Sequence, residues 1–296
     1  MRSLLRQHPL TSYFVLVFSF TWLLWTPYVL SADGLGVLDW QFPELFGDSQ
    51  LAGLAAGGYL GPLASAFLVT AIGEGRPGLR RWRARLFRWR AGARWYAFAL
   101  LGVPLLLVAS SLVIPGVLGD VHRPGWSLLP IYLAFLVMQM LTSSLAEEPG
   151  WRDFALPKLQ ARYGPLRGTV ILGPLWGWWH LPLFLTTWNR GSGGLLAIVL
   201  FTLLAVAFSI VLTWVFNRTR ESLPLVMLVH ASNNNTFSVL TAVLLPSLAT
   251  SLTVTVASLI GYGTLAIVLV VVTRGRLGYQ PTPQREPVEV TAAQRP

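Results

Sequence analysis

Two adjacent carboxylates, Glu147 and Glu148, end a long apolar run, and Arg152 follows four residues after the second. Each negative charge disfavours ionisation of the other, and burial would disfavour both. The intervening Pro149 and Gly150 predict that the helix ends here and that Arg152 turns back to pair with one carboxylate. The two carboxylates would then have unequal environments, as a general base and its neighbour do. A solvated helix end is the alternative interpretation.

Two histidines lie inside other apolar runs. Trp176 precedes His180 by four residues, and His230 precedes Asn234 by four, so each pair is expected to share a helical face. Asparagines fill the whole stretch 233–235. Ionisable groups within membrane spans are costly and are functional candidates for that reason. Hydrogen bonding between helices is the alternative interpretation of both histidines.

Together these groups could hydrolyse a peptide bond if they met in one wet cavity. By their positions along the apolar runs, Glu147, His180 and His230 are all expected in the same half of a helix bundle. The carboxylate would take a proton from water, and one imidazole would share that water. The other imidazole and the Asn234 amide could stabilise an oxyanion.

The elements that must position these residues are predicted to be membrane-spanning helices. Hydrophobic residues make up 54% of the 296 residues and charged residues 11%, against about 25% charged in soluble domains. Several apolar runs approach the roughly 20 residues needed to cross a bilayer as a helix. We expect an all-α, polytopic integral membrane protein with about eight spans. The expected spans are 10–30, 51–72, 95–115, 128–148, 166–187, 195–216, 223–245 and 251–273.

The chain is expected to form a single membrane domain over residues 1–296. Its catalytic core would lie at about 128–246. The tail 279–296 is rich in Pro, Gln and Glu, a composition typical of disorder. Cysteine is absent, which excludes a disulfide framework and a thiol nucleophile.

The positive charge is explained by topology. The net charge is +10, and the stretch 73–94 alone contains eight arginines. With eight spans every basic loop falls on one side, which predicts an inner-membrane protein with cytoplasmic N- and C-termini. The segment 80–90 alternates arginines with bulky apolar residues and is expected on the inner leaflet, in contact with membrane lipids. Nucleic-acid binding is the rival interpretation of this segment, and we do not expect a nucleic-acid partner.

Three motifs in this order resemble those of a known family. They are Glu147-Glu148-x-x-x-Arg152, Trp176-x-x-x-His180 and His230-x-x-x-Asn234. They resemble the CPBP family of intramembrane proteases, which contains the type 2 CAAX prenyl endopeptidases, also called the Abi family, and bacteriocin-processing and self-immunity proteins. The resemblance covers about residues 128–246, and Trp176 stands where Phe is common in the family.

The resemblance implies an intramembrane endopeptidase acting on a membrane-associated or lipidated peptide. It implies that Glu147 and His180 activate the water, that His230 and Asn234 bind the oxyanion, and that Glu148 and Arg152 support them. A non-catalytic membrane interaction or bacteriocin-immunity protein is the alternative. A transporter is a weaker one, because no internal repeat is visible.

A metal is the remaining question about the predicted site. Glu147, His180 and His230 could bind Zn²⁺ and leave a fourth position open. The chain has no His-Glu-x-x-His motif, and the resemblance points to a glutamate-dependent, metal-free mechanism. We therefore expect no cofactor and keep Zn²⁺ as the alternative.

Overall fold

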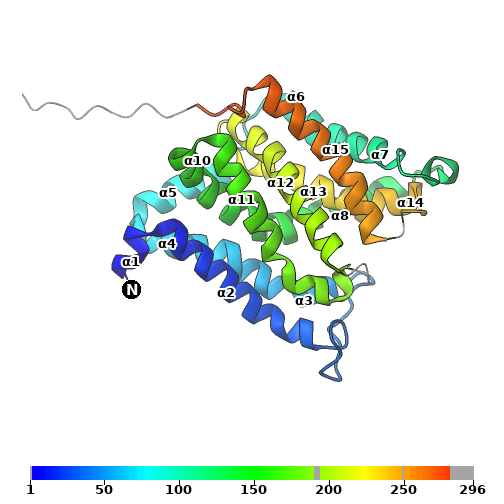
Figure 1. The fold of residues 1–296 in the computed structure, drawn as a ribbon, viewed down its shortest axis with the longest axis horizontal. Coiled ribbons are helices and arrows are strands. Elements are labelled where there is room, and N and C mark those ends of the chain that lie inside the picture. Colours follow the sequence, from blue (N-terminus) through cyan, green and yellow to red (C-terminus); the bar gives the residue numbers. More distant parts are fainter. Residues whose placement is uncertain (1, 190–193, 249, 281–296) are drawn as a thin grey trace, which may run out of the picture.

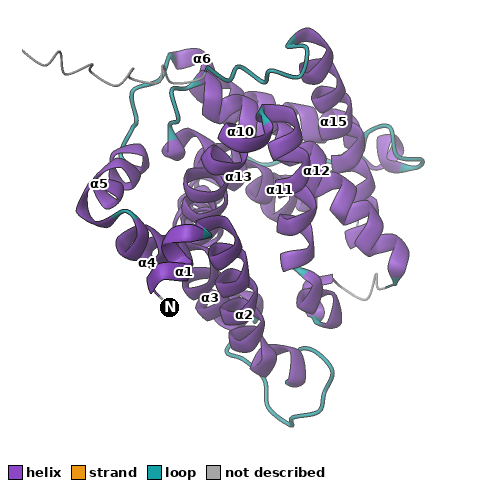
Figure 2. Ribbon diagram, turned by 60° about the vertical axis from the view of Figure 1, so that its left-hand side comes forward, coloured by secondary structure: helices purple, strands orange, loops and turns teal. Residues whose placement is uncertain are grey.

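The protein is built from helices. The computed structural model describes residues 2–189, 194–248 and 250–280. Within these ranges the regular elements are helices and no strand occurs (Figure 2). The α-helices are α1 (Arg2–Gln7), α2 (Pro9–Leu30), α3 (Gln50–Gly58), α4 (Ala64–Gly73), α5 (Gly75–Leu86), α6 (Ala93–Ala97), α7 (Val103–Ser111), α8 (Leu128–Gln139), α9 (Leu145–Glu148), α10 (Leu156–Tyr163), α11 (Pro165–Trp179), α12 (Leu195–Arg218), α13 (Leu223–Asn235), α14 (Ala242–Leu244) and α15 (Ser251–Val272).

Within the described residues, wider π-helical turns join five pairs of consecutive α-helices, and 3-10 turns occur in two of the other connections. The π-helices are η1 (Tyr59–Leu63), η2 (Phe98–Gly102), η4 (Met140–Ser144), η5 (Pro149–Ala155) and η8 (Thr236–Thr241). The 3-10 helices are η3 (Val117–Asp120), η6 (Leu181–Leu185) and η7 (Thr187–Asn189).

Within the described ranges, six helical stretches are long and apolar enough to cross a membrane. They are Pro9–Leu30, Gln50–Gly73, Ala93–Ser111, Leu128–Tyr163, Leu195–Arg218 and Leu252–Val272. The expectation of an all-α polytopic membrane protein is therefore confirmed. Helices α11, α12 and α15 run beside one another in Figure 1.

The expected spans 166–187 and 223–245 are not among these six. Helix α11 ends at Trp179, and a 3-10 turn follows from Leu181. Pro182 explains this end, since it has no N–H to continue the helix and disfavours the α conformation before it. The second stretch remains helical from α13 through α14, but its histidine and three asparagines make it less apolar.

The prediction that Pro149 and Gly150 end the fourth helix is wrong. The helix continues through them as the π-helix η5 and then as α10. Pro149 removes one backbone donor, and the wider π-turn is the accommodation found here. Gly150 allows close packing, because a Cβ at this position would lie 2.4 Å from the Tyr13 hydroxyl and 2.6 Å from the Pro62 carbonyl oxygen.

The basic segments gather at one end of the molecule. Arg6 on α1 donates to the carbonyl of Ile72 at the end of α4. Lys158 on α10 pairs with Glu74 at 2.9 Å, and Asn217 on α12 donates to the carbonyl of Leu277 beyond α15. These contacts agree with the alternation of basic and acidic loops. The compartment that this end faces stays a prediction.

The core of the protein is one continuous cluster of buried apolar side chains that extends from Tyr13 to Leu277. Close helix contacts in it depend on small residues: a Cβ at Gly173 on α11 would lie 2.7 Å from the Cα of Val206 on α12. Of the tail predicted to be disordered, residues 281–296 lie outside the described residues.

Candidate active site

Trp176 lies at the centre of the predicted site residues. It is buried on α11, and its indole Nε1 donates to Oε2 of Glu147 at 2.7 Å. Its carbonyl oxygen lies 2.9 Å from Nδ1 of His180, one turn later. Its ring centroid is 5.7 Å from the ring of His180 and also from that of His230. One tryptophan thus connects the carboxylate on α9 to both histidines.

Glu148 forms a separate ion-paired group. Its side chain is fully buried, and its Oε1 lies 2.6 Å from Nδ1 of His230 on α13. Its Oε2 lies 3.5 Å from Nε of Arg152. The expectation that Arg152 pairs with one member of the Glu pair is borne out by this geometry. The pairing follows from i,i+4 spacing along a continuing helix instead of from a turn.

Arg152 itself is completely buried. Its guanidinium carbon lies 4.4 Å from the centroid of the Trp176 ring, and Nη2 donates to the Ser209 hydroxyl on α12 at 3.1 Å. Its Nε and Nη1 atoms have no hydrogen-bond partner among the described residues, so the nearby Glu148 carboxylate and the Trp176 ring face are what chiefly offset its charge. Arg152 is therefore the cation that offsets the two adjacent carboxylates.

Asn234 joins the same region from α13. Its Nδ2 donates to the Ser143 hydroxyl at 3.0 Å, and Ser143 lies four residues before Glu147. Its Oδ1 accepts from Nδ2 of Asn233 at 2.9 Å. Asn235 points elsewhere and donates to the carbonyl of Tyr132 on α8. Asn234 and Asn235 thus both bond the stretch Leu128–Tyr163, and of the two it is Asn234 whose partner lies one helical turn from Glu147.

The hydrogen bonds of both histidines leave the same ring nitrogen available. The carbonyl of Trp176 can only accept, so Nδ1 of His180 donates and Nε2 keeps its lone pair. Nδ1 of His230 donates to the Glu148 carboxylate in the same way. The acceptor on Nδ1 fixes each tautomer, as the partners of catalytic and metal-binding histidines do. In both rings Nε2 is then the atom free for chemistry.

Aromatic rings enclose His180 on its other sides. The rings of Trp179 and Phe201 meet it edge-on, with centroids at 4.6 Å and 5.2 Å. Trp188 on η7 stacks against it at 5.7 Å. This packing keeps the His180 ring in place where α11 ends.

The possible zinc ligands do not converge. Among the described residues, no three His, Asp or Glu side chains form a group that could hold a metal ion. Glu147, His180 and His230 are connected through Trp176 and not directly to one another. The residues do not fit a zinc site in this arrangement, and we derive no step through a metal.

Sequence reasoning missed three parts of this cluster. Trp176 was expected only to share a face with His180, although a buried indole N–H normally needs an acceptor. Ser143 precedes Glu147 by four residues, and this spacing could have identified it. Ser209 lies on α12, and no signal in the sequence connects it to Arg152.

The comparison with known proteins bears on these residues. Residues 126–236 match the type II CAAX prenyl endopeptidase family, Rce1-like. This match confirms the resemblance drawn from the three motifs. All six predicted site residues lie within the matched segment.

A curated relative gives a similar result. The chain is 26% identical over 110 residues to the CAAX prenyl protease 2 of Methanococcus maripaludis. The alignment covers 36% of this chain and 40% of the relative, so the chain spans well under two thirds of that protein's length.

Proposed function

We propose that the chain is an intramembrane endopeptidase that hydrolyses a peptide bond of a membrane-associated or lipidated peptide. The observation that supports this best is the position of Trp176, which bonds Glu147 through its indole and His180 through its carbonyl. The match to the Rce1-like family supports the same reaction class. We place the basic end of the molecule at the cytoplasmic face by the positive-inside rule.

In the proposed reaction Glu147 is the general base. Its carboxylate takes a proton from water while Nε2 of His180 accepts a hydrogen bond from the same water. The hydroxide then attacks the carbonyl carbon of the scissile peptide. When the tetrahedral intermediate collapses, the C–N bond breaks and the amine leaves with the proton that Glu147 holds.

His230 and Asn234 serve the oxyanion in this proposal. Protonated on both nitrogens, His230 donates from Nδ1 to Glu148 and from Nε2 to the oxyanion. One N–H of the Asn234 amide bonds Ser143, which leaves the second N–H to donate. Glu148 and Arg152 hold this arrangement by their charges.

A lipidated substrate suits the position of the site. The Glu pair lies in the membrane-spanning stretch Leu128–Tyr163, whose exposed residues before the pair include Leu133, Val137 and Leu141. We therefore expect a substrate held in the bilayer by an attached lipid to approach along this apolar surface. The name of the relative, CAAX prenyl protease 2, suggests a prenylated C-terminal peptide as the first substrate to test. Membrane lipids complete the expected surroundings.

The decisive experiment is the isosteric variant Glu147→Gln in the purified, reconstituted chain. Loss of the general base should lower the cleavage rate of a farnesylated peptide by about 10²–10⁴. Glu74→Gln, which removes an exposed carboxylate far from Trp176, is the matched control and should cleave at the normal rate. Normal cleavage by Glu147→Gln would refute the assignment.

The natural substrate can be sought by comparing cells that carry the wild-type protein with cells that carry Glu147→Gln. Membrane fractions from cells that carry wild type or Glu147→Gln should differ in one or more proteins that remain uncut in the variant. If cells that carry Glu147→Gln and cells that carry His180→Ala both keep the wild-type phenotype, a non-catalytic interaction or immunity protein becomes the better description. A chelator that abolishes cleavage, with zinc restoring it, would replace the metal-free mechanism.

A further inference from the structure

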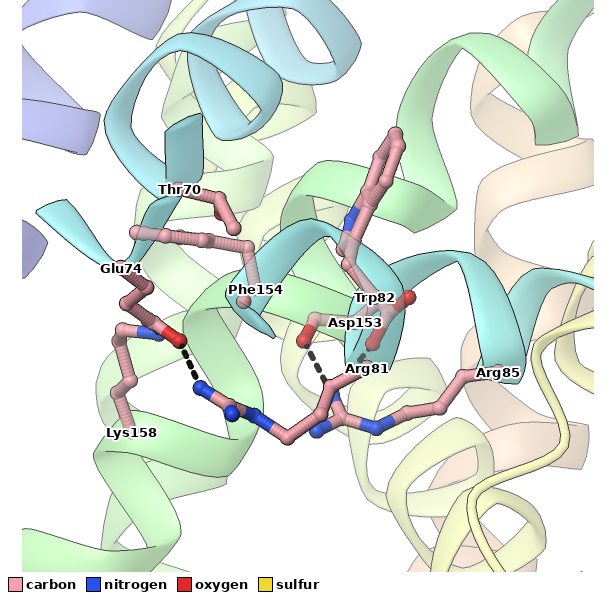
Figure 3. A pocket seen from close by; sticks show the side chains of 9 residues that line it. Thr70, Glu74, Arg81, Trp82, Arg85, Asp153, Phe154 and Lys158 are labelled. Carbon is pink, nitrogen blue, oxygen red and sulfur yellow. Dashed lines mark hydrogen bonds and ion pairs between the residues drawn. The ribbon is translucent and has the colours of Figure 1, made fainter. Parts of the chain in front are cut away.

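Helix α5 carries five arginines that divide into two sets. Arg81 pairs with Glu74 at 2.7 Å, and Arg85 pairs with Asp153 at 2.5 Å and with Glu221 at 2.9 Å. Figure 3 shows Arg81 reaching toward Glu74 and Arg85 reaching toward Asp153 from α5. This set attaches α5 to the rest of the protein.

The second set faces away from these partners. Arg76, Arg80 and Arg83 lie at i, i+4 and i+7, within about 60° of one another around the helix. All three are exposed, and no described residue forms an ion pair with them. They form a cluster of three cations that has no carboxylate partner among the described residues.

These three arginines line a groove that also has an apolar wall. The groove has a volume of about 380 Å³ and is completed by Phe67, Leu79 and Trp82. Phe67 belongs to the membrane-spanning stretch Gln50–Gly73, and this residue is 46% exposed. The apolar wall of the groove therefore begins within the bilayer. The three arginines lie on α5, which follows directly after the membrane-spanning stretch.

We propose that this groove binds one anionic phospholipid. Guanidinium groups bind phosphate through paired hydrogen bonds, and three of them converge on the groove without carboxylate partners. An acyl chain requires an apolar surface that continues into the membrane, which Phe67 provides. A free phosphate would use the arginines alone and leave the wall beside Phe67 exposed. The two-part lining therefore favours a lipid.

The groove adjoins the helix that carries the Glu pair. Trp82 forms part of its wall, and the indole Nε1 of Trp82 donates to the carbonyl of Pro149 at 3.2 Å. Pro149 directly follows Glu148. A lipid seated against Trp82 thus contacts a residue that holds α5 onto η5.

The test measures lipid binding to the full chain in a neutral detergent by native mass spectrometry. Titration with phosphatidylglycerol should saturate at one tightly bound lipid, and phosphatidylcholine should bind at least tenfold more weakly. The triple variant Arg76→Gln, Arg80→Gln, Arg83→Gln should lose at least tenfold in phosphatidylglycerol affinity. The matched control Arg167→Gln, Arg274→Gln, Arg276→Gln removes the same charge at the same end of the molecule and should bind normally.

Further variants separate the remaining explanations. Phe67→Ala should weaken phosphatidylglycerol binding severalfold, and a triple Arg→Lys variant at 76, 80 and 83 should restore part of the affinity and show that the fold is intact. If the two triple Arg→Gln variants lost phosphatidylglycerol affinity equally, general charge attraction would explain the binding and the proposed site would be wrong. Glycerol phosphate or an RNA oligonucleotide competing as well as the lipid would overturn it too.

Discussion

Two charged regions of this protein differ in how their charges are compensated: one is the buried cluster around Arg152 on η5, and the other is the outer face of α5. In the first region Glu148 and Arg152 are fully buried and pair with each other, with His230 and with Ser209. In the second region Arg76, Arg80 and Arg83 of α5 stay exposed and have no carboxylate partner among the described residues. The same residue type, arginine, is therefore a partnered core residue in one region and a surface charge in the other.

The difference shows what each region requires from its sequence. A charge inside a low-dielectric core is tolerated only when an opposite charge lies close to it, so Glu148 and Arg152 depend on each other. A charge at the membrane boundary needs only water or lipid headgroups beside it. Substitutions in the buried cluster should accordingly affect stability, and those on the outer face of α5 should affect it very little.

The largest contrast is expected at the arginines themselves. Arg152→Met leaves Glu148 buried without its cation and should lower the free energy of unfolding by about 3–5 kcal/mol. Arg80→Met, on the exposed outer face of α5, should change it by less than about 0.5 kcal/mol. Thermal unfolding in detergent measures both. The double variant Arg152→Met, Glu148→Gln should recover part of the loss, and equal effects of the two single variants would remove the distinction between the regions.

The next effect tests whether Trp176 acts through its indole N–H. Trp176→Phe keeps an aromatic face for Arg152 but removes the donor to Glu147, and should destabilise the chain by about 1.5–3 kcal/mol. Trp126→Phe is the control, since Trp126 is 93% exposed and should tolerate the change. In the background of Glu147→Ala the loss at Trp176 should shrink, because the acceptor is gone. An unchanged loss there would mean that ring packing alone matters.

A steric version of the contrast compares two glycines. A Cβ at Gly150 would meet the Tyr13 hydroxyl and the backbone of Pro62, so Gly150→Ala should cost about 1–3 kcal/mol of stability. Gly92, in the connection after α5, has open space around its Cβ position. Gly92→Ala should change the melting temperature little. Similar shifts for both variants would contradict the close packing of η5.

The sequence predicted the membrane fold and the gathering of the six site residues, because both rest on strong local signals. Long apolar runs indicate spans, and rare ionisable residues within them indicate a shared polar site. The course of the chain through Pro149 and Gly150 could not be predicted in this way. Local propensities favour a helix end there, whereas packing of Gly150 against Tyr13 keeps the chain helical. The bond from Trp176 to Glu147 joins distant helices and likewise leaves no local pattern.

The smallest effect is a pH dependence at the boundary between the two regions. Burial raises the pKa of Glu74, but ion pairs with Lys158 and Arg81 outweigh it, and the pKa lies below its model-compound value of 4.5. A lowered pKa means that Glu74 adds stability above the unfolded-state pKa and that this contribution disappears as pH falls through the lowered folded-state value. Because the side chain is 34% exposed, salt screens the pairs and the contribution should stay under about 1 kcal/mol. Melting temperatures of wild type and Glu74→Gln should therefore differ at pH 7 and low salt, and converge as the pH falls below the lowered folded-state pKa. A difference that persists in acid would mean that Glu74 stabilises the junction of α5 and α10 by packing and not by charge.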